Sequence, residues 1–351
     1  PRLDYTDSSC PALLLEPQRT NGIANSEYAG TNNWGNPQRL TTIANQTTSP
    51  EGIVNATKVN ETAVSGSHMF DYNFSATSGV AYTFSYFAKA AERTQCYLFG
   101  YTDGGVFSGQ RAVFNLSNGT ITSNVGNGIA DIQPYSNGWY RVSLTLTSSA
   151  TSTAGYWGIG LALNSATSYL GVASSGINMY GFQLEAGSYA TSYIPTYGTS
   201  VTRNGEVCDG AGNTATFNST EGVLYAEIAA LADDGTGRVI CLSDGTNSHR
   251  VLLAYDGNTN QIQAFHSNGV DIINLLFVVS DITNFHKIAF KYSLNDFALW
   301  VDGVEVLTDF SGTTNISNTF NNLKFENASG SSDFYGKTKA LVVYKEALTD
   351  E

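Results

Sequence analysis

The chain has few charged residues, and basic residues are especially scarce. Only 13% of its 351 residues are Asp, Glu, Lys or Arg, which is about half of the usual share in globular domains. The 17 Lys and Arg residues stand against 30 Asp and Glu residues, and the net charge is −13. A nucleic-acid-binding protein needs clustered basic side chains to contact phosphates. We therefore expect no nucleic-acid partner, and the acidic balance also disfavours anionic membrane surfaces.

Long apolar runs and cysteine motifs are missing as well. The sequence has no run of about 18 apolar residues, so we expect no membrane insertion. The four cysteines are not spaced like zinc ligands or a CxxC redox pair. Because Cys96 and Cys241 lie in apolar, strand-like segments, we interpret them as buried free thiols.

The motifs that identify common catalytic sites are also missing. The sequence contains no G-x-S-x-G, H-E-x-x-H, phosphate-binding loop or G-x-G-x-x-G motif. Glycosidases use a pair of carboxylates, yet no E-x-D-x-E run is present. We therefore expect a protein that is not an enzyme. A polysaccharide hydrolase or lyase is an alternative, because carboxylates far apart in sequence can meet in a fold.

What the sequence does contain is a long series of strand patterns. Residues 81–88 and 139–146 alternate large apolar with small or polar residues, which is typical of half-buried strands. Residues 297–306 (FALWVDGVEV) place Asp-Gly between alternating apolar residues, the strongest short signal for a hairpin. Helical periodicity is almost absent. The sequence therefore predicts an all-β chain.

A polar, glycine-rich stretch that also contains Pro195 interrupts these patterns at residues 186–215. We place a domain boundary near residue 203 within this stretch. The expected architecture is two tandem antiparallel β-sandwich (jelly-roll) domains, residues 1–203 and residues 204–351.

Several segments carry a resemblance to known families. Residues 13–21 (LLLEPQRTN), 49–59 (SPEGIVNATKV) and above all 182–196 (FQLEAGSYATSYIPT) resemble bacteriophage tail and appendage proteins, which have a jelly-roll domain similar to carbohydrate-binding modules. Residues 297–306 and 340–349 (ALVVYKEALT) are similar to laminin-G and concanavalin-A-like lectin domains. The resemblance implies a lectin-like fold, a glycan ligand and, in many relatives, bound calcium.

Exposed aromatic side chains are the expected glycan contacts, because sugar rings stack on flat aromatic faces. Trp34 lies in a polar loop, and one of the adjacent residues Tyr156 and Trp157 should face outward from its strand. Tyr101, Phe107 and Tyr135 flank glycine-rich turns. For Trp34 and Phe107, packing against the core is the alternative. The candidate glycan-binding residues are thus Trp34, Trp157, Tyr101, Phe107 and Tyr135.

Calcium is the expected cofactor, in a structural role, since it prefers carboxylate and carbonyl oxygens. Glu16 and Glu185 lie in segments that carry the phage resemblance, and adjacent domain ends could bring them together around one ion. Asp244 opens an Asp-Gly-Thr-Asn run with suitable residue types, for which a hairpin turn is the alternative.

These observations favour a non-catalytic virion appendage, such as a tail or head fibre, that binds host-surface glycans. Its expected partners are a cell-surface polysaccharide or glycan and other virion proteins. We expect a homo-oligomer, with a trimer as one form, at the virion surface or otherwise outside the cell. A purely structural virion component without its own ligand is the main alternative. Because the chain starts at Pro1, we expect a fragment or a processed form of a longer protein.

Overall fold

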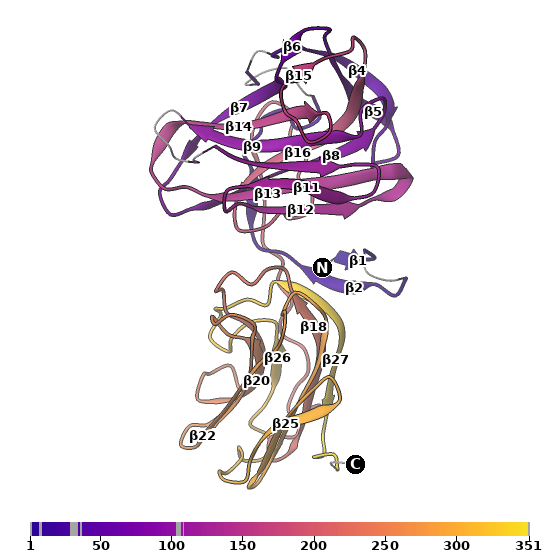
Figure 1. Cartoon of the computed structure of the whole chain (residues 1–351). Coiled ribbons are helices and arrows are strands. Elements are labelled where there is room, and N and C mark those ends of the chain that lie inside the picture. The colour runs from indigo at the N-terminus through magenta and orange to yellow at the C-terminus, as the bar shows by residue number, and fades with distance from the viewer. Residues whose placement is uncertain are drawn as a thin grey trace. The chain divides into compact units, whose positions relative to one another are not determined.

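The computed structural model describes residues 2–6, 9–28, 34–35, 37–102, 107 and 109–349. The chain divides into two compact units (Figure 1). One unit consists of residues 18–204, and the other combines residues 1–17 with residues 205–351. The division at 204/205 lies beside the expected boundary. Residues 1–17 were expected in the first domain, and this assignment was wrong.

The reason for the correction lies in strand pairing. Strand β2 (Ala12–Leu15) pairs antiparallel with β27 (Gly336–Tyr344) near the far end of the chain. Leu15 is buried in the same apolar cluster as residues of the 205–351 segment. A run of apolar residues predicts a strand, but its local pattern does not say which sheet the strand will join.

The unit of residues 18–204 is a β-sandwich whose core lies between a five-stranded and a six-stranded sheet. The five-stranded sheet has the order β11 (Thr120–Val125), β10 (Gln110–Asn115), β9 (Gln95–Thr102), β14 (Ser152–Ala162) and β7 (His68–Ala76). The six-stranded sheet has the order β12 (Ile129–Pro134), β13 (Trp139–Thr147), β8 (Ala81–Ala90), β16 (Gly176–Ala186), β5 (Val54–Glu61) and β4 (Leu40–Thr48). Two short pairs, β3 (Arg19–Asn21) with β17 (Val201–Arg203) and β6 (Ser65–Gly66) with β15 (Tyr169–Leu170), complete the unit.

The second unit is also a β-sandwich with its own core. Its seven-stranded sheet has the order β1 (Arg2–Asp4), β2, β27, β18 (Gly222–Ala230), β23 (His286–Ser293), β24 (Asp296–Val301) and β25 (Val304–Asp309). Its five-stranded sheet has the order β22 (Ile272–Val278), β21 (Gln261–Asn268), β20 (His249–Tyr255), β19 (Arg238–Ser243) and β26 (Asn322–Lys324).

The expectation of an all-β chain of antiparallel sandwiches is confirmed. No α-helix occurs among the residues that the structure describes, where the one helical element is the 3₁₀ turn Ser136–Gly138. The predicted hairpin forms between β24 and β25, and its central residues Asp302 and Gly303 have φ values of 53° and 84°. Positive φ at both central residues suits the right-handed twist of the strands.

The two apolar cysteines are buried free thiols, as predicted. Burial raises the pKa of Cys96 to about 12 and that of Cys241 to about 11, since the low-polarity surroundings disfavour the thiolate. In the described part of the chain, no helix is long and apolar enough to cross a membrane.

Candidate functional site

Three of the five predicted glycan contacts are core residues, so the prediction for Trp34, Trp157 and Phe107 was wrong. Their exposed fractions are 8%, 0% and 1%. The Trp34 ring lies edge-on to Phe70 and Phe182, with ring centroids 5.0 Å apart in both pairs. A ring packed in this way has no free face for a sugar.

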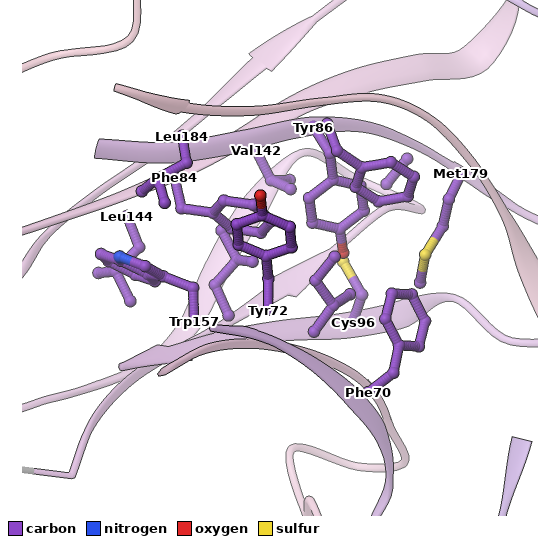
Figure 2. Close-up of a cluster of buried hydrophobic side chains, with 14 of the residues drawn as sticks. Phe70, Tyr72, Phe84, Tyr86, Cys96, Val142, Leu144, Trp157, Met179 and Leu184 are labelled. Atoms are coloured by element: carbon purple, nitrogen blue, oxygen red, sulfur yellow. The ribbon is translucent and has the colours of Figure 1, made fainter. Parts of the chain in front are cut away.

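Trp157 stacks on Phe84 at 5.8 Å and contacts Phe107 at 5.7 Å. Figure 2 shows its indole among the core side chains, beside Phe84 and Leu144. Side chains alternate between the two faces of a strand. The inward position of Trp157 therefore turns the adjacent Tyr156 outward.

The remaining two candidates are exposed but lie on different sheets. Tyr101, at the end of β9 in the five-stranded sheet, is 51% exposed. Tyr135 directly follows β12 of the six-stranded sheet, is 39% exposed and contacts Phe87 edge-on at 4.9 Å. The structure thus does not bring the two tyrosines to one surface.

Tyr101 belongs to a group of aromatic residues on the outer face of the five-stranded sheet. Its cross-strand partner is Tyr156 of β14, and the two rings stack at 6.5 Å with planes 28° apart. Two residues along each strand, Phe99 pairs with Gly158. A Cβ atom on Gly158 would lie 1.8 Å from Cε1 of Phe99, so the phenyl ring covers the glycine. The three aromatic side chains therefore share one face of the sheet, on which Phe99 also packs against the buried Tyr97 at 5.6 Å.

The neighbouring strand β7 adds polar groups to this face. Asp71 pairs with Gly158, and Asn73 pairs with Tyr156. Directly paired residues in antiparallel strands point to the same side of the sheet. We call the five residues Phe99, Tyr101, Tyr156, Asp71 and Asn73 the outer aromatic face.

Asp71 has unusual surroundings for a carboxylate. It is half-buried, and burial raises its pKa because the charged form loses solvation. Among the residues that the structure describes, no other side chain donates a hydrogen bond to it and no cation pairs with it. Glu61, in contrast, is buried, but hydrogen bonds from Arg93 and Tyr169 hold its pKa below the usual range. The pKa of Asp71 is therefore shifted in the opposite direction to that of Glu61.

The sequence predicted that either Tyr156 or Trp157 faces outward, and the structure turns Tyr156 outward. Asp71, Asn73 and Phe99 were not among the predicted site residues, although a signal for the two polar residues was present. Residues of β7 alternate between buried and more exposed positions, and Phe70 and Tyr72 face the core. Asp71 and Asn73 hold the intervening outward positions. The signal is a strand in which aromatic residues at the inward positions alternate with polar residues at the outward positions. Such outward polar side chains can bind the hydroxyl groups of a ligand.

The predicted calcium ligands Glu16 and Glu185 belong to different units, and each already has protein partners. The Glu16 carboxylate accepts a hydrogen bond from Arg2. Glu185 is buried in a polar cluster, where it accepts hydrogen bonds from Gln183 (2.8 Å) and from the backbone N–H (2.8 Å) and hydroxyl (2.6 Å) of Thr191. Donor groups and a guanidinium around a carboxylate do not fit a cation site.

The polar cluster around Glu185 explains what segment 182–196 does in the fold. Gln183 also accepts a hydrogen bond from the backbone N–H of Ile194, and Asn21 donates to the carbonyls of Phe182 and Ile194. These contacts hold the segment that follows β16 against β16 and β3. Segment 182–196 therefore has a structural role: its hydrogen bonds fix one part of the unit of residues 18–204 to another.

Asp244 forms the predicted alternative, a hairpin turn between β19 and β20. Its Oδ1 atom accepts hydrogen bonds from the backbone N–H (2.8 Å) and hydroxyl (2.6 Å) of Thr246, and Oδ2 lies 3.1 Å from Nδ1 of His249. Among the described residues, no group of three or more His, Cys, Asp or Glu side chains could hold a metal ion. Calcium binding by the chain stays a prediction that these residues do not support.

No family model and no curated protein sequence matches the chain. Among solved structures, the CBM40 of the Ruminococcus gnavus IT-sialidase, bound to α2,3-sialyllactose, is similar with a TM-score of 0.34 and 15% identity over 41% of this chain and 91% of that chain. Domains LG4-5 of the mouse laminin α1 chain are similar with a TM-score of 0.29 and 10% identity over 82% of this chain and 89% of that chain.

Proposed function

We propose that the unit of residues 18–204 is a non-catalytic glycan-binding domain, and that the sugar lies on the outer aromatic face. The observation that carries the proposal is the half-buried Asp71 carboxylate, unpaired among the described residues, on the same face of the sheet as the stacked pair of Tyr101 and Tyr156. Its Oδ1 atom lies against Gly35, where a Cβ atom would be 1.7 Å away. A carboxylate without a partner at such a position destabilises the fold. A ligand that donates hydrogen bonds to it offsets this loss of solvation.

The chemistry of the face matches a sugar. The ring faces of Tyr101 and Phe99 offer flat apolar area to the C–H groups of a pyranose. The Asp71 carboxylate accepts hydrogen bonds from sugar hydroxyls, and the amide of Asn73 both donates and accepts them. Neutral glycans fit better than sialylated or uronic-acid glycans, because the carboxylate repels a second negative charge and the chain has a net charge of −13.

The same carboxylate argues for binding without cleavage. Hydrolysis of a glycosidic bond uses two carboxyl groups, of which the general acid has a raised pKa. Asp71 has a raised pKa, but it is the single carboxyl group among the five residues of the outer aromatic face.

The wider role that we propose is that of a virion appendage that attaches to host-surface glycans. Its support is the resemblance of residues 182–196 to phage tail and appendage proteins. A structural virion part without a ligand is the competing role, and it predicts that the outer aromatic face binds no sugar.

A glycan array with the intact chain tests the proposal, with neutral glucose-, galactose- and N-acetylglucosamine-based oligosaccharides beside sialyllactose. We expect selective binding to one neutral class, which the Asp71→Asn variant weakens. Binding to no glycan, or equal binding to all of them, would overturn it. A bound oligosaccharide that is released with new reducing ends or unsaturated sugars would show an enzyme instead.

A further inference from the structure

Strand β22 lies at an edge of the five-stranded sheet in the second unit. Its residues Ile272–Val278 pair with Ser267–Gln261 of β21 in an unbroken antiparallel register. In such a strand, every second residue directs its backbone N–H and C=O away from its partner. One side of β22 therefore presents a row of backbone donors and acceptors that fits another strand.

Natural proteins protect edge strands with charge, proline, bulges, short length or a covering segment. The four large sheets have seven other edge strands, and each of these has at least one of the protective features. A register shift interrupts the pairing of β4, β11 and β25, and the segment around Trp34 and Gln38 bridges β7. The remaining edges are charged, short or contain proline, namely β1 (Arg2, Asp4), β12 (Asp131, Pro134) and β26 (three residues, with Lys324).

β22 has no charged residue, no proline and no register shift, and it is seven residues long. Its sequence, Ile-Ile-Asn-Leu-Leu-Phe-Val, contains no charged residue, proline or glycine. Its outward side chains include Ile272, Leu276 and Val278, which are 65%, 40% and 59% exposed. Exposed aliphatic residues on an unprotected edge favour pairing with another strand.

The sequence of β22 is compatible with pairing to itself. In an antiparallel pair of two β22 strands centred on Leu275, Ile272 of one copy faces Val278 of the other, and Asn274 faces Leu276. Each aliphatic residue at an end of the strand thus meets another aliphatic residue, and no like charges meet. A two-fold axis at Leu275 generates a closed dimer, in which the same surface is used by both copies.

We propose that β22 pairs antiparallel with β22 of a second copy of this chain, so that the two five-stranded sheets form one continuous sheet. The proposal is independent of glycan binding, because the outer aromatic face lies in the unit of residues 18–204. Failure of either proposal leaves the other standing.

Sedimentation velocity of the intact chain across micromolar concentrations tests this pairing, with amide hydrogen exchange as a second readout. We expect a concentration-dependent dimer in which exchange of the β22 amides slows as the dimer forms. Ile272→Lys should shift the population to monomer. Ile129→Lys is the matched control, because Ile129 is also 65% exposed and begins edge strand β12 in the other unit.

The results that would overturn the proposal are equally specific. A monomer at all concentrations excludes the pairing. So does an oligomer that persists in Ile272→Lys, or one whose formation leaves exchange of the β22 amides unchanged. If Ile272→Lys and Ile129→Lys weaken the oligomer equally, the effect is one of net charge, and the edge pairing is wrong.

Discussion

Tyr101 and Tyr156 face each other directly across β9 and β14, with ring centroids 6.5 Å apart and planes inclined by 28°. Gly100 is next to Tyr101 on β9, Trp157 is next to Tyr156 on β14, and both are buried. Because neighbouring residues of a strand face opposite sides of the sheet, the two tyrosine side chains point away from the core. The pair is therefore set in place by the same alternation that builds the sandwich. It gives the unit an aromatic surface at a defined place on the five-stranded sheet.

Gly158→Ala should damage this surface directly. The new Cβ atom would lie 1.8 Å from the Phe99 ring, so the ring must leave its position over β14. We expect a loss of about 1–3 kcal/mol in the free energy of unfolding, together with loss of glycan binding. Urea unfolding followed by tryptophan fluorescence measures the first effect, since Trp34, Trp139 and Trp157 all lie in this unit.

Gly22→Ala is the control for that substitution. Its new Cβ atom would meet only the carbonyl oxygen of Leu184, at 3.4 Å, which is ordinary contact. Equal losses of stability in the two variants would contradict the account of Phe99 and Gly158.

Asp71→Asn should make the protein more stable at neutral pH while it weakens glycan binding. Burial raises the pKa of Asp71 in the folded state above its ordinary value of 3.8. Between the pKa of the unfolded state and the raised pKa of the folded state, the folded state binds more protons than the unfolded state. The free energy of unfolding therefore falls as the pH rises through this range. Asn carries no charge and removes this fall, so the gain over the wild type should vanish below about pH 3.8.

Asp302→Asn is the counterpart with the opposite sign. Burial pushes the pKa of Asp302 upward, but hydrogen bonds from His286 and from the backbone of Lys287 lower it overall. Its contribution is present at neutral pH and is lost as pH falls through the lowered pKa. We therefore expect Asp302→Asn to destabilise the protein at neutral pH. Chemical unfolding at a series of pH values checks both variants, and a loss of stability in Asp71→Asn at neutral pH would contradict our account of Asp71.

Thr191→Val should destabilise the hydrogen-bonded cluster around Glu185, and the effect should not depend on a metal ion. The substitution removes the hydroxyl that donates to the buried carboxylate at 2.6 Å. An unsatisfied buried acceptor costs about 1–3 kcal/mol, and we expect this loss to be the same with calcium and with EDTA. Thr20→Val, which changes an exposed hydroxyl pair with Thr202, should have little effect. A calcium-dependent loss in Thr191→Val would show that Glu185 takes part in a cation site.

The fold could be predicted from the sequence because its determinants are local. Alternation of residue types marks the strands, and Asp302-Gly303 fixes a turn whose positive φ values other residues rarely adopt. Sheet membership depends on long-range pairing, as Leu13 with Thr338 shows, and no local pattern records it. Residues 1–17 were misplaced for that reason.

The candidate site was predicted only in part, and the reason is geometric. Adjacent residues Tyr156 and Trp157 must face opposite ways, but the sequence does not say which ring is inside. Packing decides this, because Trp157 fills the space beside Phe84 and Phe107. The glutamates in the family-like segments looked like ligands, whereas Glu185 accepts hydrogen bonds that hold the segment in place.

Calorimetric titration of one neutral oligosaccharide, selected from the array, into the intact wild type, Tyr101→Ala and Tyr135→Ala tests the central claim most directly. Both tyrosines are exposed, but only Tyr101 lies on the outer aromatic face. We predict that Tyr101→Ala weakens binding at least about tenfold, that is by ~1.4 kcal/mol, while Tyr135→Ala binds like the wild type. Unchanged affinity in Tyr101→Ala, or an equal loss in both variants, would contradict the claim that the sugar binds on this face.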